Sequence, residues 1–241
     1  MLQFAEVTHE SPRIYGGTYG QASRAGGSGC ERIEALFKAL PMKRRTLKAK
    51  AHVFHAGQPT HGLFLVHSGI FKTCVTSVDG REKITGFRLR GDLLGMDSFG
   101  TSTYAGDAIA LDTGEVWEIS YSDIQGHRPE FERELTSLLA AEVRRDWNWM
   151  LTVATLSAEQ RVVSFLLDLA ARLGALGFSE RRMTLRMTRA DLGSFLALKL
   201  ETVTRALTRL QGRGMIVVDG RDIQLCDALA MNEFMQTGQC H

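Results

Sequence analysis

The sequence MTRADLGSFLALKLETVTRALTRLQGRG, from Met187 to Gly214, decides how the rest of the chain is interpreted. Apolar residues recur in it at steps of three and four, the period of an amphipathic helix, and the pattern breaks once around residues 197–200. Thr188, followed three positions later by Asp191, is typical of a helix start. The stretch therefore predicts a helix-turn-helix.

The outward face of the second helix carries side chains that suit DNA. Glu201, Thr204, Arg205, Thr208 and Arg209 combine donors, an acceptor and cations, which fits base edges flanked by phosphates. A solvated helix face would show the same residue types, so this stretch alone leaves both interpretations open. Between residues 181 and 221, nine arginines and lysines stand against three acids. A phosphate backbone requires such a locally basic surface.

Length and composition indicate a globular protein of one large or two ordinary domains. The chain has 241 residues, 44% of them hydrophobic, and its net charge of +2 is too small to indicate nucleic acid. Four scattered cysteines without a C-x-x-C pair argue against a disulfide framework or a zinc knuckle. There is no apolar run of membrane-spanning length and no secretory signal, so we expect a cytoplasmic protein without a membrane partner.

Short apolar runs separated by turn signals fill residues 46–119 and predict a small antiparallel barrel or jelly roll. Asp79-Gly80 lies between two alternating segments, where a tight hairpin needs the positive φ that glycine supplies. Residues 1–29 hold six glycines and are predicted to be a mobile arm. Cys30 to Leu40 has a helical pattern that a proline ends. The effector or sensor domain is therefore expected at 30–128.

The longest helical signal covers residues 129–156 and is predicted to be a dimerisation helix. Its near-heptad stripe needs a covering surface, which a second copy of the chain would supply. Burial against the chain's own barrel is the alternative. The stripe consists of Leu135, Leu139, Val143, Asp146, Met150 and Val153. Two Asp146 carboxylates near a two-fold axis would repel and make dimerisation marginal, whereas an outward, solvated Asp146 fits the pattern equally well.

Residues 157–241 are predicted to fold as a winged helix-turn-helix. A helix over 159–175 precedes the helix pair, and Met215 to Val218 pairs with Asp222 to Leu225 across a glycine turn to form the wing. Together these elements strongly favour DNA binding. The predicted fold class is α+β: an N-terminal antiparallel β-barrel or jelly roll, a long dimerisation helix and a C-terminal winged helix-turn-helix.

Three stretches carry a resemblance to a known family. They are KITGFRLRGDLLGMDSFG at 83–100, AEQRVVSFLLDLAARLGALGFS at 158–179 and MTRADLGSFLALKLETVTRALTRLQGRGMI at 187–216. With a barrel, a long helix and a winged helix in that order, nearly the whole chain resembles the CRP/FNR transcription regulators, and most closely their FNR branch. The resemblance implies a regulator that is not an enzyme, a homodimer on palindromic double-stranded DNA, and RNA polymerase as a partner.

The resemblance also implies roles for individual residues. The FNR branch reads its half-site with the pattern E-x-x-[ST]-R, which falls on Glu201, Thr204 and Arg205 and implies a TTGA-like sequence. Arginine can donate two bonds to guanine, glutamate can accept from cytosine, and threonine offers a hydroxyl and a methyl to thymine. Phosphate contacts are expected from four further residues. These are Thr188, Arg189, Arg209 and Arg213.

The sensing end departs from the family pattern. Oxygen-sensing members hold an iron-sulfur cluster through three N-terminal cysteines and one in the last barrel strand. In the N-terminal region this chain has only Cys30, and in the last barrel strand Trp117 stands where the family has its fourth cysteine. Cyclic-nucleotide members need an arginine for the phosphate, and although Gly91-Asp92 fits their acidic position, residues 102–107 contain no arginine. We expect neither an iron-sulfur cluster nor cyclic AMP. Cys74 is expected to be a buried, inert thiol.

No cofactor and no metal site is predicted. Lone histidines in or between strands are usually surface or core residues, which disfavours a haem ligand but leaves haem as an open alternative. These histidines are His9, His52, His55, His61, His67 and His127. The alternative function is a small-molecule- or haem-binding regulatory barrel with a secondary DNA-binding role, against which the intact E-x-x-T-R pattern argues. No nucleophile-base pair, metal-ligand spacing or phosphate loop indicates an enzyme. The effector and the choice between activation and repression stay open, and loops such as Asp79 to Lys83 would face the polymerase.

Overall fold

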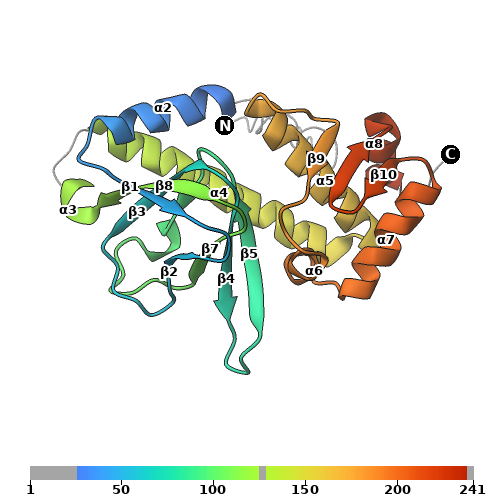
Figure 1. Cartoon of the computed structure of the whole chain (residues 1–241), viewed down its shortest axis with the longest axis horizontal. Helices are drawn as coiled ribbons and strands as arrows, with labels where there is room; N and C mark the ends of the chain where they lie inside the picture. The colour runs from blue at the N-terminus through green and yellow to red at the C-terminus, as the bar shows by residue number, and fades with distance from the viewer. Residues whose placement is uncertain (1–25, 125–128, 238–241) are drawn as a thin grey trace, which may run out of the picture.

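The computed structural model describes residues 26–124 and 129–237. They form a jelly roll, a long connecting helix and a C-terminal domain of helices with a small sheet (Figure 1). The predicted α+β class and the order of its parts are confirmed. The predicted barrel is a jelly roll of two sheets that do not close into one cylinder. Most of the predicted arm, together with His9, His127 and Cys240, lies outside the described residues.

Two four-stranded antiparallel sheets make up the jelly roll. The sheet with the order β1-β8-β3-β6 consists of β1 (Lys43–Leu47), β8 (Gly114–Ser120), β3 (Gly62–Ser68) and β6 (Leu93–Leu94). The sheet with the order β2-β7-β4-β5 consists of β2 (His52–Phe54), β7 (Asp107–Ala110), β4 (Phe71–Thr76) and β5 (Glu82–Arg88). The β4–β5 hairpin turns at the predicted place, with Gly80 at a φ of 78°. Its tip extends beyond the body of the molecule (Figure 1).

Hydrophobic side chains from both sheets fill the interior of the jelly roll. The Phe54 ring stacks on Tyr104 with 4.0 Å between centroids, and Phe64 packs beside them. The Tyr104 hydroxyl donates to the Gly62 carbonyl at 3.0 Å, which satisfies it inside the core. Alternate residues of β3 and β8 point to the opposite face, where a second cluster includes Trp117.

Helices cover this second face. α2 (Gly26–Lys38) supplies Ile33 and Phe37, and α4 (Pro129–Thr155) follows the short η1 (Met96–Ser98) and α3 (Tyr121–Ile124). The expected start of the first helix at Cys30 was wrong, because α2 begins at Gly26 within the predicted arm. Glycine in a helix interior is less favourable than alanine by about 1 kcal/mol. The three glycines of this first turn therefore gave no helical signal in the sequence.

The C-terminal domain has the predicted helices and wing. It consists of α5 (Ala158–Ala175), β9 (Arg182–Thr184), α6 (Arg189–Leu196), α7 (Leu200–Gly212), β10 (Ile216–Asp219), β11 (Asp222–Leu225) and α8 (Ala228–Thr237). The three strands form an antiparallel sheet in the order β10-β11-β9. No helix among the described residues is both long and apolar enough to cross a membrane.

The stripe predicted on α4 falls into two environments. Leu135 is only 7% exposed and packs with Leu139 onto the jelly roll, so the alternative of burial against the chain's own barrel holds for this end. Val143 and Met150 are exposed, and Val153 is half-buried. The environment of the stripe therefore changes along α4, and its role as a dimer interface stays a prediction.

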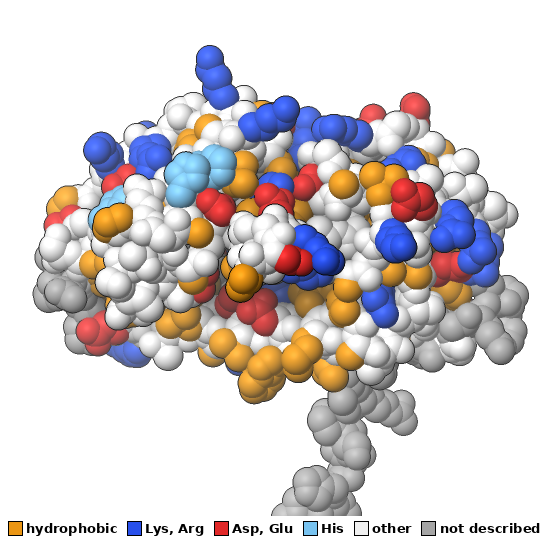
Figure 2. All heavy atoms as spheres, turned by 90° about the horizontal axis from the view of Figure 1, so that it is seen from below, with side chains coloured by type: hydrophobic (Ala, Val, Ile, Leu, Met, Phe, Trp, Pro, Cys, Tyr) orange, Lys and Arg blue, Asp and Glu red, His pale blue; other side chains and the backbone are white. Residues whose placement is uncertain are grey.

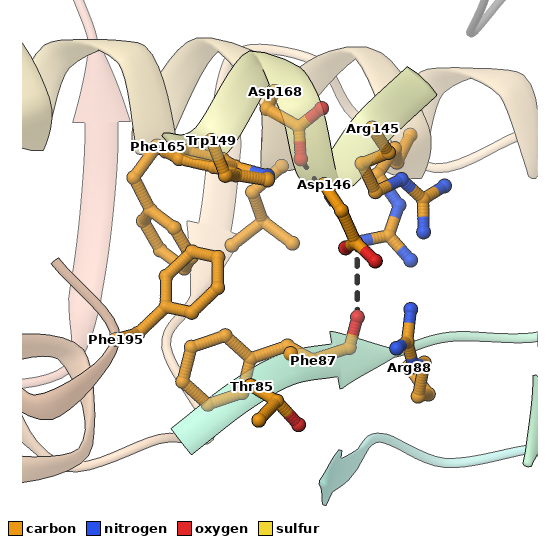
Figure 3. Close-up of a pocket in the computed structure, with 12 residues that line it drawn as sticks. Thr85, Phe87, Arg88, Arg145, Asp146, Trp149, Phe165, Asp168 and Phe195 are labelled. Atoms are coloured by element: carbon orange, nitrogen blue, oxygen red, sulfur yellow. Dashed lines mark hydrogen bonds and ion pairs between the residues drawn. The ribbon is translucent and has the colours of Figure 1, made fainter. Parts of the chain in front are cut away.

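Asp146 lies at the edge of the exposed part of α4. It lines a hollow between α4, β5 and α5, where its carboxylate lies above β5 (Figure 3). Burial, together with the charge of Glu142, raises its pKa. Neighbours within its own chain therefore already disfavour the charged form of Asp146. The expected repulsion between two Asp146 residues at a two-fold axis stays a prediction.

A network of ion pairs joins the jelly roll to α5. Asp92 follows β5, accepts a hydrogen bond from the Leu89 N–H at 2.8 Å and pairs with Arg172 of α5. Arg172 also donates to the Phe87 carbonyl at 3.1 Å and lies 3.9 Å from Asp168. Burial alone would raise the pKa of Asp92, yet the neighbouring arginines hold it below its usual value. Asp92 thus has a structural role within the chain.

The same network includes α4. Arg145 lies 3.8 Å from Asp92 and 3.3 Å from Glu142, and Glu142 pairs with Arg88 of β5. Figure 3 shows Arg88, Arg145 and Asp168 converging from the three elements. One partly buried cluster of charges therefore fixes the sheet, α4 and α5 with respect to one another.

We expect Arg172→Leu to lower the free energy of unfolding by about 3 to 5 kcal/mol, because it leaves the carboxylates of Asp92 and Asp168 buried without their closest cation. Urea denaturation followed by circular dichroism measures the change. Arg181→Leu is the control, since Arg181 is exposed in the same domain, and its midpoint should match that of the unchanged protein. Equal effects of the two substitutions would contradict a supporting role of the network.

Candidate nucleic-acid interface

α6, the first helix of the pair, begins with the predicted capping box. The Thr188 hydroxyl accepts from the Asp191 N–H at 3.0 Å, and the Thr188 N–H donates to the Asp191 carboxylate at 2.9 Å. These reciprocal bonds satisfy two N–H groups at the helix start. The Thr188 hydroxyl also donates to Asp191 at 2.7 Å. Its predicted phosphate contact stays a prediction, with the hydroxyl engaged inside the chain.

The turn between α6 and α7 depends on Gly193, which the sequence analysis did not single out. Ala197 ends α6 in a left-handed conformation with a φ of 54°, and the Leu198 N–H donates to the Gly193 carbonyl at 2.8 Å. A Cβ on Gly193 would lie 2.6 Å from the Leu198 carbonyl oxygen. Only glycine fits there without a backbone shift. The signal that could have found it is a glycine inside a helical pattern.

α7, the second helix, buries one face and exposes the other. The buried residues are Val203, Ala206, Leu207 and Leu210. Glu201 and Arg205, two of the predicted base-contacting residues, are exposed and lie one turn apart. Thr204 is half-buried, and its hydroxyl accepts from Arg189 at 3.4 Å. The structure thus brings together Thr204, predicted to contact a base, and Arg189, predicted to contact a phosphate.

Two predicted phosphate-contacting residues share a carboxylate that sequence reasoning missed. Glu159, in the first turn of α5, accepts from Arg209 at 2.8 Å and from Arg213 at 2.7 Å. Two guanidinium groups against one carboxylate leave a net positive charge at this edge of α7. Glu159 therefore orients both cations. Its position depends on the packing of α5 against α7, and an acidic residue in a first helical turn is the only sequence signal for it.

The wing completes a basic surface. β10 and β11 turn at Gly220, which has a φ of 59°, and Arg221 beside it is exposed. Arg181 and Arg182 are exposed at the start of β9. Figure 2 shows clusters of Lys and Arg side chains over the C-terminal half of the molecule. The exposed cations of α7 and of the wing are therefore available to a polyanion.

α6 docks on the β4–β5 hairpin. Lys72 Nζ lies 2.7 Å from a Glu82 carboxylate oxygen and 3.0 Å from one of Asp191. The Ser194 hydroxyl accepts from the Ile84 N–H at 3.0 Å. Burial alone would lower the pKa of Lys72, but its bonds to the two carboxylates outweigh burial and raise it. Asp191 thus caps α6 and also ties the DNA-binding domain to the jelly roll.

Comparisons with known proteins agree with this geometry. Residues 44–126 match the model of the cyclic nucleotide-binding domain, and residues 160–234 match that of the Crp-like helix-turn-helix domain. The chain is 35% identical over 210 residues to the anaerobic regulatory protein of Pasteurella multocida, covering 86% of this chain and 77% of that protein. It is 36% identical over 190 residues to the transcriptional activator protein anr of Pseudomonas aeruginosa, covering 78% of each.

The chain belongs to the CRP/FNR family of transcription regulators. Its structure is similar to that of FixK2 from Bradyrhizobium japonicum, with a TM-score of 0.73 and 27% identity over 80% of this chain and 97% of that one. The family consists of regulators that bind DNA through the helix-turn-helix, so the expectation that the protein is not an enzyme is confirmed.

The thiols of this CRP/FNR regulator lie in separate parts of the fold. Cys30 lies in α2, Cys74 in β4 and the exposed Cys226 after β11. Burial, followed by the charge of Glu34, raises the pKa of Cys30 to about 11. Burial, followed by the charge of Glu82, raises the pKa of Cys74 to about 12. The expected burial of Cys74 is confirmed, because it is 1% exposed.

We expect Gly193→Ala to lower the free energy of unfolding by about 1 to 3 kcal/mol, because the added Cβ would meet a backbone oxygen at 2.6 Å. Thermal unfolding followed by circular dichroism measures this. Gly212→Ala is the matched control, since a Cβ there meets nothing within 4 Å and alanine favours the last turn of α7. Its stability should stay equal or rise. A loss of the same size in both variants would show that the close approach is not the cause.

Proposed function

We propose that this CRP/FNR regulator acts as a homodimer whose two α7 helices read a TTGA-like palindrome. The observation that carries the proposal is the exposed face of α7, which presents Glu201 and Arg205 on the same helix as the arginines oriented by Glu159. Arg205 can donate two bonds to guanine, and Glu201 can accept from cytosine. Binding to chromosomal DNA also goes with the expected cytoplasmic location.

The dimer interface of the proposal is the exposed apolar part of α4. Val143, Trp147 and Met150 are 44%, 60% and 62% exposed and lie on one face, because they are spaced four and three residues apart. Figure 2 shows hydrophobic side chains gathered along one edge of the molecule. Large apolar side chains gathered on a surface mark an interaction site, and a two-fold axis would bury the same face of both copies.

Regulation in this proposal does not use a four-thiolate iron-sulfur cluster or cyclic AMP. The thiolate form binds iron, whereas burial keeps Cys30 protonated, and Trp117 lies 1% exposed on its strand, stacked on His67. Phe54, Phe64 and Tyr104 fill the interior of the jelly roll. Arg45 lies against this interior, with its guanidinium 5.5 Å from the centroid of the Phe64 ring, but it is already paired with Glu118 at 3.3 Å, which supports an effector other than a cyclic phosphate.

RNA polymerase is the proposed protein partner at the promoter. The tip of the β4–β5 hairpin projects from the body of the molecule (Figure 1), and Val78 in it is fully exposed. Asp79 pairs with Arg81 at 2.7 Å, so the tip offers one apolar side chain beside an ion pair. A projecting surface of this kind suits a protein contact that leaves α7 free for DNA.

Glu201→Ala should reduce discrimination at one base pair of the half-site by about 1 to 3 kcal/mol, because the variant loses an acceptor directed at a base edge. Gel shifts with a TTGA palindrome and with duplexes altered at single positions measure it. Arg209→Ala is the comparison: it should weaken binding to all duplexes alike and lower the salt dependence of binding. If Glu201→Ala weakens every duplex equally, Glu201 does not read a base.

Met150→Asp should raise the dissociation constant of the dimer by at least about tenfold. Burying the Met150 side chain in the proposed interface would contribute about 1.5 to 3 kcal/mol to association, and the variant would place a charge there instead. Sedimentation equilibrium measures the constant. Leu229→Asp is the control, since Leu229 is 79% exposed on α8. Dimers of equal strength in both variants would place the interface elsewhere.

A further inference from the structure

Two histidines and an aspartate from separate parts of the sequence meet on the surface of the jelly roll. His52 lies in β2, His55 in the turn after it, and Asp107 begins β7. β2 pairs with β7, and the register shifts between His52 and Phe54. Residues three apart in a regular strand point to opposite faces, so this irregularity is what turns His55 to the side of His52.

We propose that His52, His55 and Asp107 bind a divalent transition-metal ion such as Zn²⁺. Each residue offers one ligand atom, and these atoms all lie within 4.8 Å of one another. His55 Nδ1 is 3.3 Å and His52 Nε2 is 3.9 Å from the same Asp107 carboxylate oxygen. Both imidazole nitrogens thus lie near the same carboxylate oxygen.

The spacing suits a tetrahedral ion. Metal-ligand bonds of about 2.0 to 2.2 Å in that geometry place the ligand atoms roughly 3.3 to 3.6 Å apart. The separation between His55 and Asp107 already has this value. The ring of His52 stacks on that of His55 with 3.9 Å between centroids, and His52 Nε2, which is 3.9 Å from the Asp107 oxygen, would have to move closer to that oxygen when an ion binds. The side chain of His55 is 63% exposed, which lets an ion enter and water take the fourth position.

The donor set selects the chemical class of the ion. Two imidazoles and one carboxylate suit zinc and its neighbours in the first transition row, whereas calcium and magnesium prefer sets made of oxygen. A ligating imidazole binds the ion through an unprotonated ring nitrogen. The Ala56 N–H donates to the ligating oxygen of Asp107 at 3.3 Å, which fixes the carboxylate from outside the site.

The site is separate from the DNA-binding surface and from the ion-pair network. The alternative to a metal site is that these residues form only an ordinary pair of histidine and aspartate on the surface. His61 offers the matching case, since its Nε2 lies 3.3 Å from a carboxylate oxygen of Glu118. Among the described residues, only the trio of His52, His55 and Asp107 brings three ligands of this kind together. His61 therefore serves as the internal control.

Isothermal titration of the full chain with ZnCl₂, after treatment with EDTA and removal of any purification tag, tests the proposal. We expect one ion per chain to be bound through these residues. His55→Ala and Asp107→Asn should each weaken binding by at least about tenfold, since even the loss of a supporting partner costs that much. His61→Ala should bind as the unchanged chain does. The absorption spectrum of the Co²⁺-loaded protein should show tetrahedral bands that both site variants lose.

Either of two results would overturn the proposal. One is the absence of Zn²⁺ binding in the unchanged chain, which would leave only a surface pair of histidine and aspartate. The other is binding that His55→Ala and Asp107→Asn leave unaltered, which would place the ion elsewhere. His55 is exposed, so its variant should fold. A circular dichroism spectrum equal to that of the unchanged chain separates loss of the ligand from loss of the fold.

Discussion

The pairing of Asp92 with Arg172 is the interaction on which the arrangement of the two domains depends. Removing an ion from water costs several kcal/mol, so the charges of this network are tolerated only while each has its partners. That condition holds in one relative placement of β5, α4 and α5. Hydrophobic contacts between the same elements would accept small sliding movements, whereas paired charges do not. The network therefore specifies the junction more narrowly than apolar packing could.

α5 carries this constraint to the DNA-binding surface. Its C-terminal half holds Arg172, while its first turn holds Glu159, which orients Arg209 and Arg213 of α7. A rigid helix of 18 residues thus links the buried charges at one end to the exposed cations at the other. The basic edge of α7 is thus connected to the sheet of the jelly roll by ionic contacts at both ends of α5, in addition to the direct contact of α6 with the β4–β5 hairpin.

The sequence was most informative where the determining signals are local. The capping box at Thr188, the hairpin at Asp79-Gly80 and the wing each follow from residues that lie close together in the chain, and the structure has all three. The family and the order of its parts followed from the same stretches. Long amphipathic segments set the elements, and turn chemistry set their ends.

The features that were missed arise from contacts between distant segments. Glu159 acts through residues 50 and 54 positions away, and Gly193 is required by the backbone of the following turn. Asp107 joins the two histidines only through strand pairing with a register shift. The stripe on α4 was read as one surface, although Leu135 packs on the jelly roll while Met150 is exposed. Hydrophobic periodicity gives the face of a helix but not what covers it.

The double use of Asp191 has a thermodynamic consequence. Its carboxylate closes the first turn of α6 and at the same time holds Lys72 of the jelly roll. Fraying of that turn and separation of the two domains are therefore linked equilibria, and whatever favours one favours the other. A perturbation at Lys72 reaches the helix-turn-helix as a change in local order at the start of α6, even if α7 itself keeps its shape.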